Sequence, residues 1–457
     1  MVWEKSKEAN INYLSKIVNI QQFEPHPNAD KMKIAHVDGY NVCMGLDEQP
    51  GLYVYFPVNS TINPNILSYC NLYRDCEKNK DATKKGFFED NGRVTAIKLR
   101  GTPSEGFLLP YEALTSFIQD SLNVVVPEED VTNIEFDTFT YNNKSFWISK
   151  KYIIPVKSYP VSNQSGRKRS VKRFNRVLDT QFRFHYNTTL IKKEPWAIQP
   201  NDLISLTSKI HGASSIFAYV LCRKPLTILD RISNILTGKK WSENKLIYDY
   251  LYASRSVIKN ANYNPNPNPG YYGIDIWGEA NKVIKPFLTK GMTIYAEIVG
   301  YTPDGKYIQK NYDYGCVPPE NNEYVSEKNF KVRVYRITYT NIDGITHEFS
   351  AREVQQWCKN NGLIPVTELY YGFAKDLYPD IPINEDWATK FWERLANDKN
   401  FYMECNSPEC NNKVPHEGIV IKKEDMHARA WKLKTYAFLN KEQLELDTGE
   451  LNIEDNA

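Results

Sequence analysis

Short β-type segments separated by turns fill the first part of the chain, and they constrain its fold more than any other feature. The clearest are KMKIAHVDGYNVCMG, GLYVYFPVNSTI and GRVTAIKLRG, the last leading into SEGFLLP. Asp38-Gly39 lies within the first segment and suits a hairpin turn. A further strand in NKSFWISKKYIIP would complete this unit near Pro155. About five strands of this length favour a small closed β-barrel over a sandwich.

Length and composition bound the remaining possibilities. At about 150 residues per domain, 457 residues allow two to four domains. Lys and Arg number 57 against 55 Asp and Glu, so any basic surface must be local. With 41% hydrophobic and 25% charged residues, the composition excludes an intrinsically disordered chain.

Several observations bear on the compartment. The eight cysteines form no CxxC pair, which favours free thiols in a reducing environment. The first residues lack the apolar core of a signal peptide, and no run approaches the ~18 apolar residues of a membrane span. We therefore expect a cytoplasmic protein, in a host cytoplasm if the source is viral, with no membrane partner.

The chain divides by composition into four parts. Residues 8–155 form the β-rich domain, and residues 156–178 form a basic linker within a stretch rich in Lys and Arg and free of acids. That stretch is either a solvated hinge or a contact for phosphates. Residues 179–440 combine predicted helices and strands. NKLIYDYLYASRSVI predicts a helix, whereas TIYAEIVGY, FKVRVYRITY and HEGIVIKK predict strands. We expect an α+β domain there and a polar tail over residues 441–457.

A lysine in a predicted turn is the first candidate for chemistry. Lys209-Ile210-His211-Gly212 lies between the strand-like segments DLISLTS and ASSIFAYV. Taken alone, this short pattern favours an ordinary surface lysine before a turn. An amine that attacks phosphorus must lose its proton, and neighbouring cations promote that loss.

Further cations lie near the end of the chain. In Trp431-Lys432-Leu433-Lys434 the two lysines share one face of a predicted strand, because side chains at i and i+2 point the same way. Two adjacent cations suit a triphosphate, where they would hold the α-phosphate and the leaving pyrophosphate. A solvent-exposed strand face is the alternative.

Two glutamates interrupt apolar strand-like runs. Glu417 precedes Gly418-Ile419-Val420-Ile421, and Glu297 lies within Tyr295–Val299. A carboxylate in such a run is costly unless it meets a cation, a metal or ligand hydroxyls. Magnesium commonly takes one or two carboxylates, so the pair is a candidate metal site. Positions at the rim of a sheet would also accommodate both acids.

The order of these signals is more specific than any one of them. KIHG at 209–212, SRS at 254–256, AEI at 296–298, EGIVIK at 417–422 and WKLK at 431–434 follow one another along the chain. This order resembles motifs I, Ia, III, IV and V of the covalent nucleotidyltransferase superfamily of RNA ligases, ATP-dependent DNA ligases and mRNA capping enzymes. KVRVYRI, with Tyr335, resembles motif IIIa.

The likeness extends over nearly the whole chain. An N-terminal unit with HPNADKMKIAHVDG and GRVTAIKLRGTPSEGFLLP, followed by FRFHYNTTL and the lysine motif, is similar to the Deinococcus-type ATP-dependent RNA ligases. The resemblance implies an oligonucleotide-binding (OB) barrel followed by an α+β, ATP-grasp-like nucleotidyltransferase domain of antiparallel sheets flanked by helices. The 23 residues after Lys434 are too few for the C-terminal OB domain of DNA ligases and capping enzymes.

The resemblance also implies roles for individual residues. Lys209 would attack the α-phosphate of ATP to give lysyl-AMP, and Lys432 and Lys434 would stabilise that phosphate. Glu417 would bind the catalytic Mg²⁺, or Mn²⁺, through water, and Glu297 the ribose or the metal's hydration shell. The other implied contacts are Arg255 with the ribose or the strand phosphate, Tyr335 and Val420 around the adenine, and His211 and Gly212 at the nucleotide. The AMP would pass to an RNA 5′-phosphate, and a 3′-OH would then displace it, in nicked duplexes or other broken RNA; we expect a monomer.

The sequence departs from the superfamily pattern at several positions. His211 replaces the usual Asp of the lysine motif, which leaves the metal arrangement open. Ser208 replaces a frequent acid, Ser214 stands where one subfamily has Asn, and Arg336 replaces part of a common Phe-Asp pair. The remaining alternatives are a capping-type guanylyltransferase, a DNA ligase, or a non-catalytic RNA-binding protein with a ligase-like fold.

Overall fold

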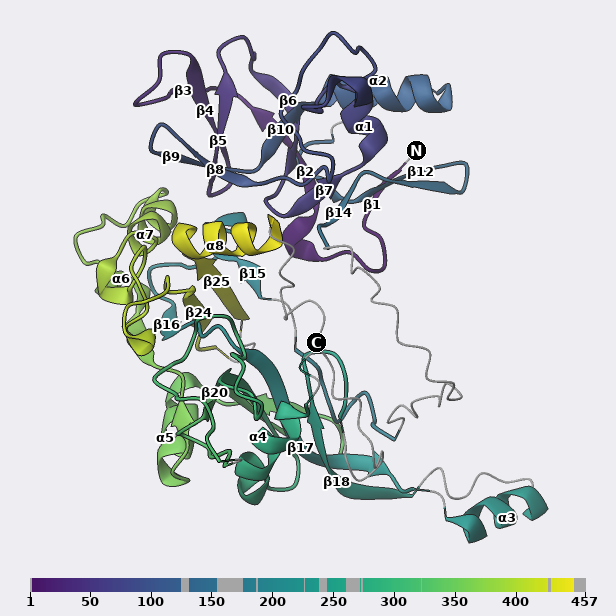
Figure 1. Ribbon diagram of the computed structural model, residues 1–457, viewed down its shortest axis with the longest axis vertical. Helices are drawn as coiled ribbons and strands as arrows, with labels where there is room; N and C mark the ends of the chain where they lie inside the picture. The colour runs from purple at the N-terminus through teal and green to yellow at the C-terminus, as the bar shows by residue number, and fades with distance from the viewer. Residues whose placement is uncertain are drawn as a thin grey trace. The chain divides into compact units, whose positions relative to one another are not determined.

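The computed structural model describes residues 2–124, 131–153, 176–185, 188–225, 227–237, 245–259, 272, 274–321, 323–425 and 429–447 (Figure 1). The chain divides into two compact units. The first comprises Met1–Pro155, Asn187–Ala197 and Asn384–Trp392, and the second comprises Val156–Tyr186, Ile198–Ile383 and Glu393–Ala457. The predicted linker lies outside the described residues apart from 176–178, where Arg176 forms an ion pair with Asp249.

The N-terminal unit consists of short strands in several small sheets. One sheet has the order β10-β6-β2-β11, a second β3-β4-β5 and a third β1-β12-β13, while β8-β9 and β14-β7 form pairs. The elements are β1 (Val2–Glu4), β2 (Ser15–Ile20), β3 (Glu24–Pro25), β4 (Met32–Val37), β5 (Tyr40–Gly45), β6 (Gly51–Phe56), β7 (Ser60–Ile62), α1 (Pro64–Tyr69), β8 (Ala96–Leu99), β9 (Thr102–Glu105), β10 (Phe107–Pro110), α2 (Tyr111–Leu122), β11 (Glu135–Phe136), β12 (Thr138–Tyr141), β13 (Lys144–Trp147) and β14 (Ser149–Lys151).

The predicted hairpin is present in this unit. Val37 pairs with Tyr40 across β4 and β5, and Asp38 takes a φ of 50° in the turn between them. The strand pairings of the described residues do not close into one barrel. The unit is therefore β-rich, as the sequence predicted, whereas the OB barrel is not confirmed.

Two antiparallel sheets organise the second unit. One contains β25-β24-β16-β23 in that order, and the other contains β18-β17-β19-β20-β21 with β22 parallel to β20. From residue 189 onwards the elements are β15 (Thr189–Leu190), β16 (Leu203–Ser208), β17 (Ala213–Arg223), α3 (Ile228–Thr237), β18 (Leu246–Ala253), α4 (Ile276–Ile284), β19 (Met292–Gly300), β20 (Phe330–Thr340), β21 (Thr346–Glu348), α5 (Ala351–Asn360), β22 (Ile364–Pro365), β23 (Glu368–Phe373), α6 (Ala374–Leu377), α7 (Trp387–Leu395), β24 (Gly418–Lys423), β25 (Arg429–Lys434) and α8 (Tyr436–Asp447). Of these, β15 and the first part of α7, up to Trp392, belong to the first unit.

The core of the larger sheet lies around β19, in which all nine residues are buried. A strand in the middle of a sheet that is covered on both faces is expected to be apolar throughout. Glu297 departs from this expectation, because it is a charged residue in β19. Trp277 and Ile284 of α4 and Val354 of α5 pack into the cluster that also contains Ile294 of β19. None of the helices in the described part of the chain has the length and apolar content needed to span a membrane.

Two predicted elements are wrong. The segment predicted as a helix from NKLIYDYLYASRSVI forms strand β18, which pairs with β17 from Ile216–Ala253 to Arg223–Leu246. Its Tyr and Ile side chains favour a pleated strand once a partner strand is available. Residues 441–447, expected in a polar tail, continue α8, in which Glu442 and Gln443 are buried.

Candidate active site

The backbone of the lysine turn is fixed by two neighbouring strands. Lys209 follows β16, as predicted, and its N–H donates to the carbonyl of Gly418 at 2.9 Å. The N–H of Ser208 donates to the carbonyl of Thr367, also at 2.9 Å. Because Ser208 lies opposite Ile419 in the antiparallel pair of β16 and β24, Lys209 comes next to Gly418, the residue after Glu417.

A buried carboxylate between two lysines forms the centre of the site. Lys209 Nζ donates to Glu417 Oε1 at 2.5 Å, and Lys434 Nζ lies 3.9 Å from the same oxygen. The Glu417 side chain is 1% exposed. Lys434 also pairs with Glu442 of α8, at 2.8 and 2.9 Å from its two carboxylate oxygens. Burial of these charges is tolerable only because they are paired.

Two glycines allow the strands to approach this turn closely. A Cβ on Gly212 would lie 2.5 Å from the carbonyl oxygen of Ile298 and 2.8 Å from Glu297 Cγ. Gly418 has a φ of +139°, and a Cβ there would lie 2.0 Å from the carbonyl oxygen of Leu433. The glycines after His211 and Glu417 are therefore required by packing at the site.

His211 is enclosed by aromatic side chains. Its ring meets the rings of Tyr312 and Phe438 edge-on, each with centroids 4.9 Å apart. Its backbone N–H donates to the Tyr314 hydroxyl at 2.7 Å, and its Nδ1 lies 3.9 Å from Glu417 Oε2. The histidine thus occupies a fixed position against the central carboxylate. The three aromatic residues were not found from the sequence, because no local pattern marks them.

A second histidine, His416, precedes Glu417 and contacts Ser208, the residue that precedes Lys209. His416 Nε2 lies 2.9 Å from Ser208 Oγ, and the Thr435 hydroxyl donates to the His416 carbonyl at 2.7 Å. Burial, with the nearby charge of Lys209, lowers the pKa of His416 to about 4. The ring is therefore neutral at neutral pH. From the sequence, His416 was considered only as a possible zinc ligand beside Cys405 and Cys410, and not as a residue of the lysine site.

Glu297 and Tyr335 lie on adjacent strands of the larger sheet. Glu297 on β19 is 8% exposed and lies opposite Ser214 of β17. The Tyr335 hydroxyl lies 2.9 Å from His185 Nδ1, and His185 Nε2 lies 2.8 Å from Ser214 Oγ. Burial raises the pKa of Tyr335, and the Glu297 carboxylate raises it further. His185, which precedes β16 in the chain, thus lies between the hydroxyl of Ser214 on β17 and the hydroxyl of Tyr335 on β20.

Strand register gives the positions of the other predicted residues. Lys432 lies opposite Val420 across β25 and β24, and it shares a face with Lys434 while Trp431 and Leu433 are buried. The predicted alternation is therefore confirmed. Arg255 lies in the turn after β18, which is closed by a hydrogen bond from the N–H of Ser254 to the carbonyl of Val257 at 2.9 Å.

The two glutamates suit a divalent cation. Over the described ranges, no group of three or more His, Cys, Asp or Glu side chains is arranged as a metal site. Magnesium, however, takes one or two carboxylates and completes its shell with water and phosphate oxygens. Glu417 accepts a hydrogen bond from Lys209, and a Cβ on Gly212 would lie 2.8 Å from Glu297 Cγ. These carboxylates approach one short turn from different sheets and fit Mg²⁺ or Mn²⁺.

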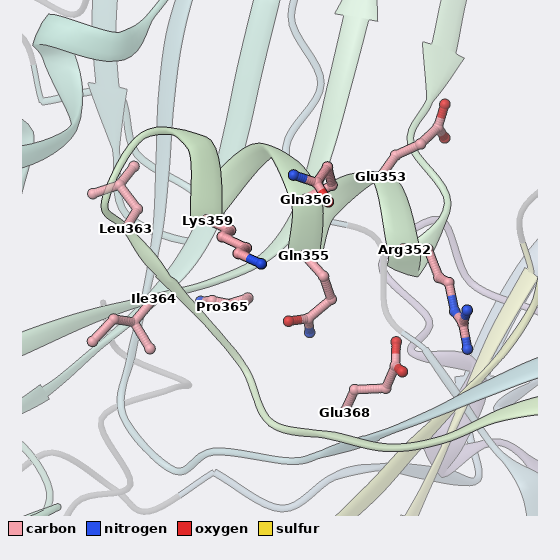
Figure 2. Close-up of a pocket in the computed structure, with 9 residues that line it drawn as sticks. All are labelled: Arg352, Glu353, Gln355, Gln356, Lys359, Leu363, Ile364, Pro365 and Glu368. Carbon is pink, nitrogen blue, oxygen red and sulfur yellow. The ribbon is translucent and has the colours of Figure 1, made fainter.

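A separate pocket of about 730 Å³ lies in the same unit (Figure 2). Side chains of α5, the Leu363–Pro365 segment and Glu368 line it, and Figure 2 shows Arg352 and Glu368 pointing towards each other. Burial raises the pKa of Glu368, while the Arg352 charge opposes the shift. None of the residues of the predicted motifs lines this pocket.

Comparison with known proteins shows the fold. No family model and no curated protein matches the sequence. A mutant of Naegleria gruberi RNA ligase with ATP and Mn has a TM-score of 0.53 at 17% identity, covering 94% of this chain and 99% of that chain. The same ligase with PPi gives 0.52 at 16% identity, covering 95% and 99%, and a mutant with AMP and Mn gives 0.50 at 17%, covering 94% and 98%. The chain therefore has the fold of an RNA ligase.

Proposed function

We propose that this chain is an ATP-dependent RNA ligase that joins RNA 3′-OH and 5′-phosphate ends through lysyl-AMP and adenylylated-RNA intermediates. The observation that carries the proposal is the buried cluster of Lys209, Glu417 and Lys434, with 2.5 Å between the lysine amine and the carboxylate, in a chain with an RNA ligase fold. A lysine that must attack phosphorus needs an adjacent proton acceptor and adjacent cations. This cluster supplies both.

In the first step the Lys209 amine forms a P–N bond to the α-phosphorus of ATP, and the bond to pyrophosphate breaks. Glu417 is positioned to accept the amine proton, because Lys209 already donates a hydrogen bond to it. Lys434 and Lys432 lie on one face of β25 and would neutralise charge on the phosphate and the pyrophosphate.

The remaining site residues would hold the nucleotide and the metal. Glu417 and Glu297 would bind Mg²⁺, or Mn²⁺, which supplies Lewis-acid neutralisation of the phosphates when present. Tyr335 and Val420 would flank the adenine, with His185 fixing the Tyr335 hydroxyl. Arg255 would meet the ribose or the incoming strand phosphate.

The second and third steps use RNA as substrate. A 5′-phosphate oxygen attacks the AMP phosphorus and releases the Lys209 amine, and a 3′-OH then attacks the 5′-phosphorus and releases AMP. We propose repair of nicked RNA in the cytoplasm as the use of this chemistry, by a monomer of the Deinococcus-type family whose N-terminal unit serves as an OB-like RNA-binding domain.

Covalent labelling tests the proposal. Purified protein is incubated with Mg²⁺ and α-labelled ATP or GTP and resolved on a denaturing gel, beside Lys209→Ala and the surface variant Lys282→Ala. We expect label from ATP on the parent and on Lys282→Ala, and none on Lys209→Ala. Label from GTP alone would indicate a capping-type enzyme, and no label from either nucleotide on protein freed of AMP by pyrophosphate would indicate a non-catalytic binder.

A further inference from the structure

Strands β17 and β18 pair at one edge of the larger sheet (Figure 1), and three tyrosines lie on these two strands. Tyr219 lies opposite Tyr250, and the two rings stack with centroids 4.0 Å apart and planes 6° apart. The Tyr248 ring lies 5.6 Å from that of Tyr219. All three are half-buried, so each ring keeps part of its surface in solvent.

Two lysines lie over these rings. Lys285, in the 3-10 turn Lys285–Phe287, has its Nζ 4.7 Å from the centroid of Tyr250, and Lys290 Nζ is 5.4 Å from that of Tyr248. The N–H of Gly291 donates to the Tyr219 carbonyl at 2.7 Å, which fixes the turn that contains Lys290 beside β17. Within the part of the chain that the structure describes, neither lysine forms an ion pair with a carboxylate. We name these five residues, Tyr219, Tyr248, Tyr250, Lys285 and Lys290, the tyrosine–lysine patch.

The patch is separate from the nucleotide site. Side chains alternate between the faces of a strand, so Tyr219 and Ser214 of β17 point to opposite faces. Ser214 faces His185 and lies opposite Glu297. Tyr219 and Tyr250 instead pack at the margin of the core cluster that contains Phe217 and Trp277. The patch therefore has no part in the chemistry at Lys209.

We propose that the tyrosine–lysine patch binds an unpaired RNA strand of the ligation substrate. Every base has a face that can stack on an aromatic ring, and lysine ammonium groups beside the rings can reach the phosphates between stacked bases. A duplex keeps its base faces stacked on one another and offers only its backbone and grooves, so the rings favour an unpaired segment. The inference rests on the proposed RNA ligase function and adds a substrate-holding surface away from Lys209.

Binding of a labelled single-stranded RNA oligonucleotide to the full chain, followed by fluorescence anisotropy across a salt series, tests the proposal. Tyr248→Ala should weaken binding about 5- to 150-fold, the range expected when one stacking partner is lost. The double variant Lys285→Ala/Lys290→Ala should lower the salt slope by about 1.4, because each phosphate contact on a single strand contributes about 0.7. Tyr248→Phe, which keeps the ring, should bind like the parent.

Two controls distinguish a loss of RNA binding at the patch from misfolding and from a failure of the proposed ligase function. Lys282→Ala removes a lysine of α4 that pairs with Glu279 at 2.8 Å, and it should leave RNA binding unchanged. Lysyl-AMP formation should be unaffected in every patch variant, and its absence from the parent would reject the ligase function rather than the patch. A double variant with the affinity and salt slope of the parent would overturn the inference, as would a loss confined to duplex RNA.

Discussion

The ion pair of Lys209 and Glu417 gives the most quantitative prediction. At an effective dielectric of about 20, opposite unit charges 2.5 Å apart attract by about 7 kcal/mol, and those 3.9 Å apart by about 4 kcal/mol. Desolvation offsets most of this, and removing one partner of a buried pair typically costs 3–5 kcal/mol. We expect Glu417→Gln to lower the free energy of unfolding by about 3–5 kcal/mol, because it leaves both Lys209 and Lys434 without their shared carboxylate.

A double-mutant cycle isolates the pair. Lys209→Met should cost less than Glu417→Gln, since Glu417 would keep Lys434 at 3.9 Å. The coupling free energy should be about 1.5–3 kcal/mol, the range for charges in direct contact. Urea unfolding followed by circular dichroism measures the four proteins of the cycle, and hydrogen exchange of the Lys209 amide, which donates to Gly418, reports on the site itself.

Lys282→Met is the matched control, because that lysine forms an exposed ion pair with Glu279. The coupling free energy between Lys282 and Glu417 should be too small to measure. A coupling free energy below about 0.5 kcal/mol between Lys209 and Glu417 would rule out a stabilising ion pair between them, because independent sites deviate from additivity by no more than that.

Three further substitutions test features of the site and of the N-terminal unit. Gly418→Ala should abolish lysyl-AMP formation and lower the melting temperature, because its Cβ would lie 2.0 Å from the Leu433 carbonyl oxygen; a parent-like melting temperature would contradict this. Glu442→Gln removes the charged partner of Lys434 and should slow single-turnover adenylylation roughly ten- to hundredfold, and a rate within twofold of the parent would reject a positioning role. Burial raises the pKa of Glu135, but its partners Lys193 and Lys5 outweigh burial and lower the pKa overall. The stabilising effect of this carboxylate is therefore present above its unfolded-state pKa and is lost as pH falls through the lower folded-state value. Urea unfolding of Glu135→Gln should therefore show a deficit at pH 7 that disappears in acid, and an equal deficit at both pH values would contradict the sign.

The sequence predicted those parts of the site that depend on local pattern. The turn at Lys209, the shared face of Lys432 and Lys434, the strand that carries Glu297 and the strand that follows Glu417 were all predicted from alternation and from charges placed in apolar runs. These features need only neighbouring residues for their interpretation, so one sequence suffices to find them.

The features that were missed depend on contacts between distant segments. Strand β18 looked helical because its pairing with β17 cannot be read from its own residues. Tyr312, Phe438 and Glu442 reach the site from a loop and from a helix that local patterns left unassigned. The small N-terminal sheets share strand content with a barrel, and only the long-range pairings distinguish the two arrangements.

The most direct test of the proposed lysyl-AMP chemistry is the mass of the protein after incubation with ATP and Mg²⁺, followed by peptide mapping. We expect one added adenylyl group per chain, located on the peptide that contains Lys209 and removed by excess pyrophosphate. An adenylyl group on a different lysine, or an unmodified chain that had first been stripped with pyrophosphate, would contradict this expectation.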